Sequence, residues 1–135
     1  MKIKLLFFSL IFYFSCVGAP DADHGLVENL PAIINESNVF SFVLRADNFT
    51  YDESFDINVT IETGQFLVST LIVTDYKGND TTSIQLTDVN SSNIYNYKIV
   101  GNLVVTNDEK NDQPKKANIK LNNFSGIFEW VVTNK

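Results

Sequence analysis

Residues Phe55-Asp-Ile-Asn-Val-Thr-Ile-Glu62 decide the fold class of this chain, because every odd-numbered position is apolar and every even-numbered position is polar. A repeat of two residues places successive side chains on opposite faces of a β-strand. The apolar members are mostly β-branched, which favours strands over helices. The stretch therefore predicts a half-buried strand with one face toward a core and the other toward solvent.

Other stretches extend this strand pattern along the chain. Residues 83–87, 117–121 and 127–132 also alternate, and the last of them places aromatic side chains on one face. Val39–Leu44 and Phe66–Val73 are instead apolar on both faces, so we expect them to lie centrally with both sides covered.

The segment Ile94–Val105 is long and contains Gly101, which indicates a bend or a bulge. Turn signals separate the segments at Thr63–Gly64, Lys77–Asp80, Asn90–Asn93, Asn107–Lys116 and Ser125–Gly126. About seven short strands at this spacing predict an all-β chain that forms a single antiparallel β-sandwich. With one cysteine in the sequence, no internal disulfide can form.

The first residues have the pattern of an export signal. Lys2 and Lys4 precede the apolar run Leu5–Val17, which as a helix of about 13 residues would span about 20 Å, less than a bilayer core of about 30 Å. Small residues follow, so we expect a signal peptide over residues 1–18. Residues 19–36 are then expected to form a loosely ordered N-terminal arm, and residues 37–135 the β-sandwich. The mature chain has no stretch that predicts a transmembrane segment.

Six Asn-X-Ser/Thr sequons support a eukaryotic secretory route. They lie at Asn35, Asn48, Asn58, Asn79, Asn90 and Asn123. We expect glycosylation there, and occupied sites must face solvent. An alternative interpretation is a bacterial surface lipoprotein anchored at Cys16, because Tyr13-Phe-Ser-Cys16 loosely matches a lipobox.

The composition excludes several classes of function. A net charge of −6 argues against a nucleic-acid partner, which would require a basic face. One histidine and one cysteine leave no basis for a zinc module or a His-based triad. Neither a nucleophile-elbow motif nor a phosphate-binding glycine loop occurs. We therefore expect a non-enzymatic protein with no catalytic or metal-binding residues and no cofactor.

Two groups of residues remain open to a second interpretation. Asp47, Asp52, Glu53 and Asp56 are expected around a turn, where carboxylates could hold Ca²⁺ in a calcium-binding or enzymatic module. Aromatic residues could form a ligand-binding surface, although alternating strands usually turn such residues into the core. These aromatic residues are Tyr95, Tyr97, Phe128 and Trp130.

The end of the chain, Ala117-Asn-Ile-Lys-Leu-Asn-Asn-Phe-Ser-Gly-Ile-Phe-Glu-Trp-Val-Val132, resembles the end of the small insect proteins named for multiprotein bridging factor 2. Leu71-Ile-Val-Thr-Asp75, followed by Gly78, is similar to their central strand and turn. The glycine-rich stretch that follows that strand in the family is absent here. The resemblance implies a secreted protein of saliva, venom or haemolymph, and it brings no catalytic residues.

Together these observations predict a secreted, extracellular, non-enzymatic β-sandwich protein of an animal secretion. Its partner would be an extracellular protein, a glycan or a small ligand. The calcium-binding or enzymatic module and the lipoprotein anchored at Cys16 are the alternatives.

Overall fold

The computed structural model describes residues 25–78 and 81–135, including every side chain in these ranges except that of Asp108. The signal peptide, Cys16 and the Asn79 sequon lie outside the described residues. The described residues form strands and no helix, and so include no helix that could cross a membrane. The strands are β1 (Ala32–Asn35), β2 (Val39–Asp56), β3 (Leu67–Thr74), β4 (Thr82–Asp88), β5 (Asn93–Ile99), β6 (Leu103–Lys110) and β7 (Pro114–Asn134).

Two long strands divide the fold into two layers. The first part of β2 pairs with the last part of β7, from Val39↔Thr133 to Ala46↔Gly126, and the last part of β2 pairs with the first part of β7. One layer has the order β1-β2-β7-β3-β6, which we call the five-stranded layer. In the other, the four-stranded layer, β7 also pairs with β4 and β4 with β5. All these pairs are antiparallel, which confirms the predicted fold class.

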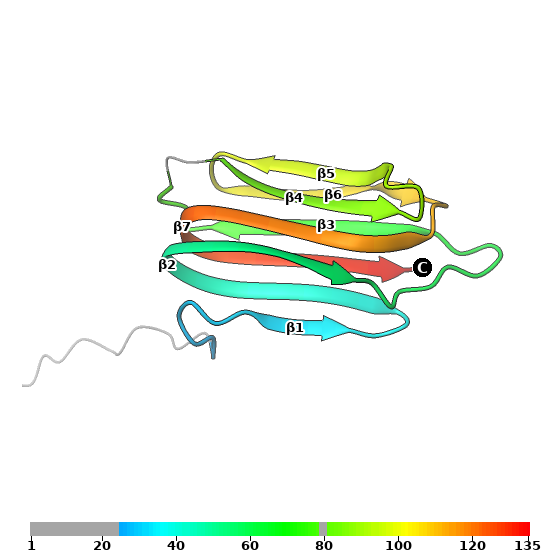
Figure 1. Ribbon diagram of the computed structural model, residues 1–135, viewed down its shortest axis with the longest axis horizontal. Coiled ribbons are helices and arrows are strands. Elements are labelled where there is room, and N and C mark those ends of the chain that lie inside the picture. Colours follow the sequence, from blue (N-terminus) through cyan, green and yellow to red (C-terminus); the bar gives the residue numbers. More distant parts are fainter. Residues whose placement is uncertain (1–24, 79–80) are drawn as a thin grey trace, which may run out of the picture.

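β2 and β7 double back on themselves at the same end of the molecule (Figure 1). The ladder between them shifts register between Ala46 and Tyr51, and two asparagines there, Asn48 and Asn123, have left-handed backbones with φ of 49° and 44°. Both begin an Asn-Phe-Ser/Thr triplet, and the two phenylalanines are partners in the ladder. Asparagine tolerates this conformation better than most residues. The same triplet thus bends both strands at matching positions, which we call the bend.

Hydroxyl groups hold the two strands together at the bend. The Asn48 backbone N–H donates to Ser125 Oγ at 2.7 Å, and Ser125 Oγ donates to Asp47 Oδ1 at 3.2 Å. Thr50 Oγ1 donates to Asn123 Oδ1 at 3.3 Å. These bonds occupy polar groups that the register shift removes from the regular ladder.

The core lies between the two layers and is rich in aromatic side chains. Phe42, in the first part of β2, packs against Tyr51 and Phe55 in its last part, with ring centroids 5.5 and 6.3 Å apart. Trp130 meets Phe40 edge-on at 5.6 Å, and both side chains are fully buried. The predicted inward face of residues 127–132 is confirmed, since its alternate side chains are all buried.

Buried hydrogen bonds also join the layers. Tyr97 Oη on β5 donates to Ser69 Oγ on β3 at 2.7 Å, and Trp130 Nε1 donates to the same oxygen at 2.9 Å. Tyr95 Oη donates to the Leu67 carbonyl oxygen at 2.8 Å. Burial raises the pKa of Tyr97, while its hydrogen bond with Ser69 acts in the opposite direction. Tyrosines from one layer thus bind polar groups of the other directly.

Three strand predictions differ from the structure. Strand β2 ends at Asp56, so residues 57–62 keep the predicted burial pattern without ladder pairing. Their backbone is held partly by side chains, as where Gln113 Oε1 accepts from the Ile61 N–H. Residues 94–105 form two strands in different layers, separated near Gly101, and the two segments predicted in 117–132 form one bent strand.

The edge of the five-stranded layer includes part of the segment expected to be a loose arm. Within that segment, Ala32–Asn35 forms β1 and pairs with β2 from Ala32↔Val43 to Asn35↔Phe40. Before β1, Glu28 makes an isolated parallel bridge with Arg45, so the chain meets β2 a second time outside the antiparallel ladder. The described part of this segment therefore contributes an edge strand.

Candidate binding surface

The outer face of the five-stranded layer is formed by the side chains that alternate with the buried ones. Val43, Glu129 and Ile72 lie side by side across β2, β7 and β3, and β6 adds Val104 next to Ile72. Two residues further along each strand, Ser41, Val131, Thr70 and Thr106 form the next row across the same four strands. The outer face consists of Ala32, Ile34, Val39, Ser41, Val43, Val68, Thr70, Ile72, Val104, Thr106, Glu129, Val131 and Thr133. On the other side of the first row, Arg45, Ile127 and Thr74 form the border of this face at the bend.

The outer face is built from short, branched side chains and hydroxyl groups. Glu129 is its one ionisable member, Arg45 lies in the bordering row, and no member is aromatic. Side chains on the central strands are half-buried by their neighbours, whereas Val104 near the edge is 73% exposed. Thr70 and Thr106 form a hydroxyl–hydroxyl hydrogen bond of 3.0 Å. The surface is therefore flat, weakly polar and nearly uncharged.

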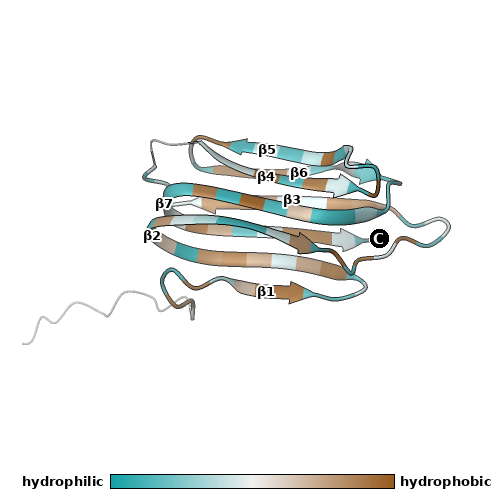
Figure 2. Ribbon diagram, in the orientation of Figure 1, coloured by the Kyte–Doolittle hydropathy of each residue, from teal (hydrophilic) through white to brown (hydrophobic). Residues whose placement is uncertain are grey.

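The opposite face, on the four-stranded layer, has different chemistry. Asn118, Gln85 and Asn96 form one row across β7, β4 and β5, and lysines such as Lys116 and Lys120 lie beside it. Lys120 forms an ion pair of 3.3 Å with Asp52. In Figure 2, β5 is mostly hydrophilic, whereas the first part of β2 is mostly hydrophobic. An antiparallel sheet that faces water usually carries such polar residues, so the four-stranded layer has an ordinary solvent face.

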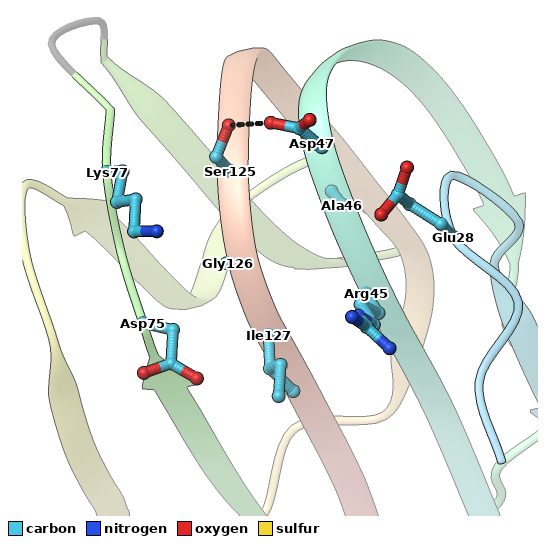
Figure 3. A pocket seen from close by; sticks show the side chains of 9 residues that line it. All are labelled: Glu28, Arg45, Ala46, Asp47, Asp75, Lys77, Ser125, Gly126 and Ile127. Atoms are coloured by element: carbon cyan, nitrogen blue, oxygen red, sulfur yellow. Dashed lines mark hydrogen bonds between the residues drawn. The ribbon is translucent and has the colours of Figure 1, made fainter. Parts of the chain in front are cut away.

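A charged hollow of about 340 Å³ borders the outer face at the bend. It combines Arg45 and Lys77 with three carboxylates, and Ile127 lines it between the strands (Figure 3). Gly126 also lines the hollow, with φ of 141°. The hollow is open and carries charges of both signs.

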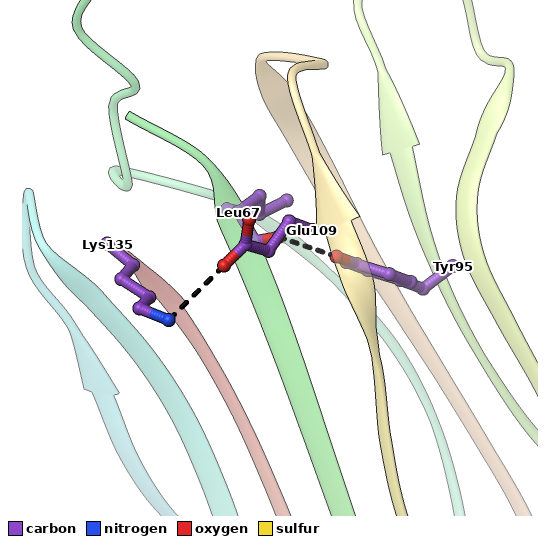
Figure 4. A network of polar contacts seen from close by, with 4 residues as sticks. All are labelled: Leu67, Tyr95, Glu109 and Lys135. Carbon is purple, nitrogen blue, oxygen red and sulfur yellow. Dashed lines mark hydrogen bonds and ion pairs between the residues drawn. The ribbon is translucent and has the colours of Figure 1, made fainter. Parts of the chain in front are cut away.

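A second hollow, of about 610 Å³, borders the outer face at the opposite end of β3. Val68 and Thr106 of the outer face line it together with Glu109 and Lys135. The Lys135 ammonium lies 3.2 Å from Glu109 Oε1, and the Tyr95–Leu67 hydrogen bond lies close by (Figure 4). Charged groups thus border the apolar surface at both ends.

This arrangement has the anatomy of a protein–protein interface, with a weakly polar centre and a charged rim. Four strands of about eight residues and the four-residue β1, about 4.8 Å apart, give a flat area of about 570 Å². A standard interface buries about 800 Å² on each partner. Because accessible area exceeds flat area, the outer face is large enough for one side of such an interface.

The predicted glycosylation residues fall into different environments. Asn48, Asn58, Asn90 and Asn123 are exposed, and Asn35 is half-buried. None of the five belongs to the outer face of the five-stranded layer. Sugars on any of them would be attached outside this surface.

The structure also places the residues of the calcium and aromatic alternatives. Asp47, Asp52, Glu53 and Asp56 follow one another along β2, so the expected acidic turn is a strand. Among the described residues, no three His, Cys, Asp or Glu side chains come close enough to hold a metal ion. Tyr95, Tyr97, Phe128 and Trp130 lie in the core, which confirms the favoured interpretation over an exposed aromatic surface.

Comparisons with known proteins assign no family. No protein-family model and no curated protein matches the chain. A solved structure described as "CBM4 structure and function" is 12% identical over 76% of this chain and 83% of that chain, with a TM-score of 0.35. The capsular polysaccharide assembling protein CapF from Staphylococcus aureus is 13% identical over 74% of this chain and 23% of its own, with a TM-score of 0.32. Values this low carry no inference about what the protein binds.

Two segments with apolar residues on both faces are the sequence signal for the outer face. Val39–Leu44 and Phe66–Val73 were expected to be covered on both sides because both of their faces are apolar. The structure covers the inner side with the core, and no described element lies over the outer side. The apolar residues on that side are therefore the feature that a binding function has to explain.

Proposed function

We propose that the protein is an exported, glycosylated and non-enzymatic binding protein of an animal secretion, and that it docks a partner protein on the outer face of the five-stranded layer. The observation that carries the proposal is the uncovered apolar side of two central strands, β2 and β3. Central strands with two apolar faces normally have cover on both sides. A partner would supply the cover that the described chain lacks.

The chemistry of the surface favours a protein over the other candidate ligands. A small ligand usually binds in an enclosed cavity, whereas the outer face is flat and both bordering hollows are open. Sugar rings commonly stack on exposed aromatic side chains, and the outer face has none. The matching partner surface is largely apolar and places a cationic group opposite Glu129.

Site-directed photo-crosslinking in the native fluid tests this proposal. A benzophenone amino acid is placed at Thr70, on the outer face, or at Gln85, which is also half-buried but lies on the opposite face. We expect the Thr70 probe to attach one discrete partner protein, which the Gln85 probe does not attach. Equal labelling from both positions, or no labelling from Thr70, would overturn the proposal.

Two lysine variants on the same strand provide the matched control. Val131→Lys introduces a charge at the centre of the outer face, and Asn118→Lys introduces the same charge on the opposite face of β7. An unpaired charge at the centre of an interface costs several kcal/mol, so we expect affinity for the crosslinked partner to fall at least about tenfold in Val131→Lys only. Equal losses in both variants would contradict the assignment.

A further inference from the structure

The sequons of the described chain differ in what their side-chain amides already bind. An N-glycan is attached through Asn Nδ2, so the contacts of that nitrogen in the folded protein show whether a sugar can be accommodated. Of the five described sequons, Asn35 and Asn58 use the nitrogen to close a structural contact, and Asn48 and Asn90 leave it in solvent. The fifth, Asn123, accepts a hydrogen bond from Thr50 Oγ1 at its side-chain oxygen.

Asn35 and Asn58 are joined by a group of hydrogen bonds, which we call the lock. Asn35 Nδ2 donates to the Asp56 carbonyl oxygen at 2.8 Å, and Asn35 Oδ1 accepts from the Asn58 N–H at 2.9 Å. Asn58 Nδ2 donates back to the Asn35 carbonyl oxygen at 2.9 Å. This lock ties the end of β1 to the segment that follows β2. Because Asn35 is half-buried and Asn58 Nδ2 points at the backbone of β1, a sugar on either nitrogen would press against β1.

Asn90 has the opposite environment. It lies in the turn between β4 and β5, where Asp88 Oδ1 accepts from the backbone N–H groups of Asn90 and Ser92, each at 2.8 Å. Asp88 therefore holds the turn, and the Asn90 side chain has no hydrogen bond within the described chain. The residue is exposed, so its nitrogen has room for a sugar.

Asn48 is similar, at the bend. Its backbone N–H donates to Ser125 Oγ, but its exposed side chain makes no hydrogen bond to any described residue. The left-handed backbone belongs to the bend and does not depend on the side-chain nitrogen. A sugar at this position leaves the contacts of the bend intact.

We propose that the folded, secreted protein carries N-glycans at Asn48 and Asn90 and that Asn35 and Asn58 remain unmodified. The proposal rests on the export stated under the proposed function. The co-reactant is a lipid-pyrophosphate-linked oligosaccharide. The bond between sugar C1 and the pyrophosphate oxygen breaks, C1 bonds to Asn Nδ2, the nitrogen loses one proton, and the lipid pyrophosphate leaves.

Glycan transfer acts on the unfolded chain, so selection among the sites occurs when the chain folds. A sugar at Asn35 or Asn58 leaves one hydrogen on Nδ2 but has to fit against β1, so we expect such a chain to close the lock poorly and to be retained in the cell. Sugars at Asn48 and Asn90 lie at the bend and at the β4–β5 turn, at opposite ends of the sandwich (Figure 1). Both positions leave the outer face of the five-stranded layer open to a partner.

Peptide mapping of the full chain tests the assignment. The chain is produced in animal cells behind the signal peptide of another secreted protein, so the result does not depend on its own first residues. Enzymatic removal of N-glycans in isotopically heavy water converts each occupied Asn to a labelled Asp. We expect label at Asn48 and Asn90 in most secreted molecules, and none at Asn35 and Asn58. Label at Asn35 or Asn58 comparable with that at Asn90, or none at Asn48 and Asn90, would overturn the proposal.

Variants separate glycan loss from structural damage. Asn90→Gln should remove the mass of one glycan and leave the melting temperature unchanged. Asn35→Gln should leave the glycan mass unchanged and lower the melting temperature. If Asn35→Gln is not secreted, Ser37→Ala destroys the same sequon while keeping Asn35, and the secreted mass should again not change apart from the substitution. A glycan lost in Ser37→Ala would overturn the proposal. Failure of this proposal is distinguishable from failure of the docking surface, because the Thr70 crosslink can be measured with protein from which the sugars have been removed.

Discussion

Ser69 is the residue on which the polar part of the core depends. Its fully buried Oγ accepts hydrogen bonds from Tyr97 Oη and Trp130 Nε1, which come from opposite layers. Ser69→Ala removes the acceptor and leaves two buried donors unsatisfied, each costing about 1–3 kcal/mol. We expect urea unfolding to show a loss of about 3 kcal/mol.

Ser83→Ala is the matched control for this change. Ser83 is half-buried on the outer side of the four-stranded layer, and the substitution should change the free energy of unfolding by less than about 0.5 kcal/mol. Equal effects of the two substitutions would show that the hydroxyl of Ser69 is not the contact that matters.

The inward direction of single aromatic residues could be predicted from the sequence, because it depends on local alternation. Phe128 and Trp130 are separated by one residue and both lie in the core as expected. The role of Ser69 could not be predicted in the same way. It arises only when β3 meets residues 28 and 61 positions later in the chain.

At the scale of elements, the bend of β7 depends on Gly126. Its φ is 141°, and a Cβ at this position would lie 2.7 Å from the Thr74 carbonyl oxygen. Gly126→Ala therefore combines backbone strain with a contact against main chain, and we expect a loss of at least about 2 kcal/mol in urea unfolding. Gly101→Ala, where nothing lies within 4 Å of the added carbon, should change stability by less than about 0.5 kcal/mol. A tolerated Gly126→Ala would contradict this account of the bend.

Strand faces were more predictable than strand limits. In residues 55–62 the predicted inner and outer faces are correct, but pairing stops at Asp56 because side chains such as Asn35 and Gln113 replace the neighbouring strand. Ser125–Gly126 was interpreted as a turn between two strands, since a local pattern does not distinguish a turn from a bent strand whose partner bends with it.

For the whole molecule, the pairing of β2 with β7 predicts slow folding. Phe42 and Trp130 are partners, although most of the chain separates them in sequence. Folding rates fall as contacts become less local, and β-sandwiches fold in about milliseconds to seconds. The single tryptophan is fully buried, so its fluorescence reports the process. We expect stopped-flow refolding from urea in that range; complete refolding within microseconds would contradict the topology.

The architecture of the molecule could be predicted, whereas its exposed apolar face could not. Val39–Leu44 has apolar residues on both faces, and the sequence predicts that other parts of the same chain cover both of them. A single sequence does not record which apolar surface another molecule covers. The outer face becomes visible only once strand order places β1 and β6 at the edges of its layer.

The shared bend also constrains how this protein can change in length during evolution. A residue inserted in the first or the last part of β2 would turn every later side chain of that part to the opposite face of the sheet. Pairing would be kept only if β7 gained a residue at the facing position. Relatives should therefore vary in length at residues 57–65, 75–78 and 100–102, which lie between strands and outside the strand ladders. Within the two bent strands, a deletion should survive only when its counterpart is deleted as well.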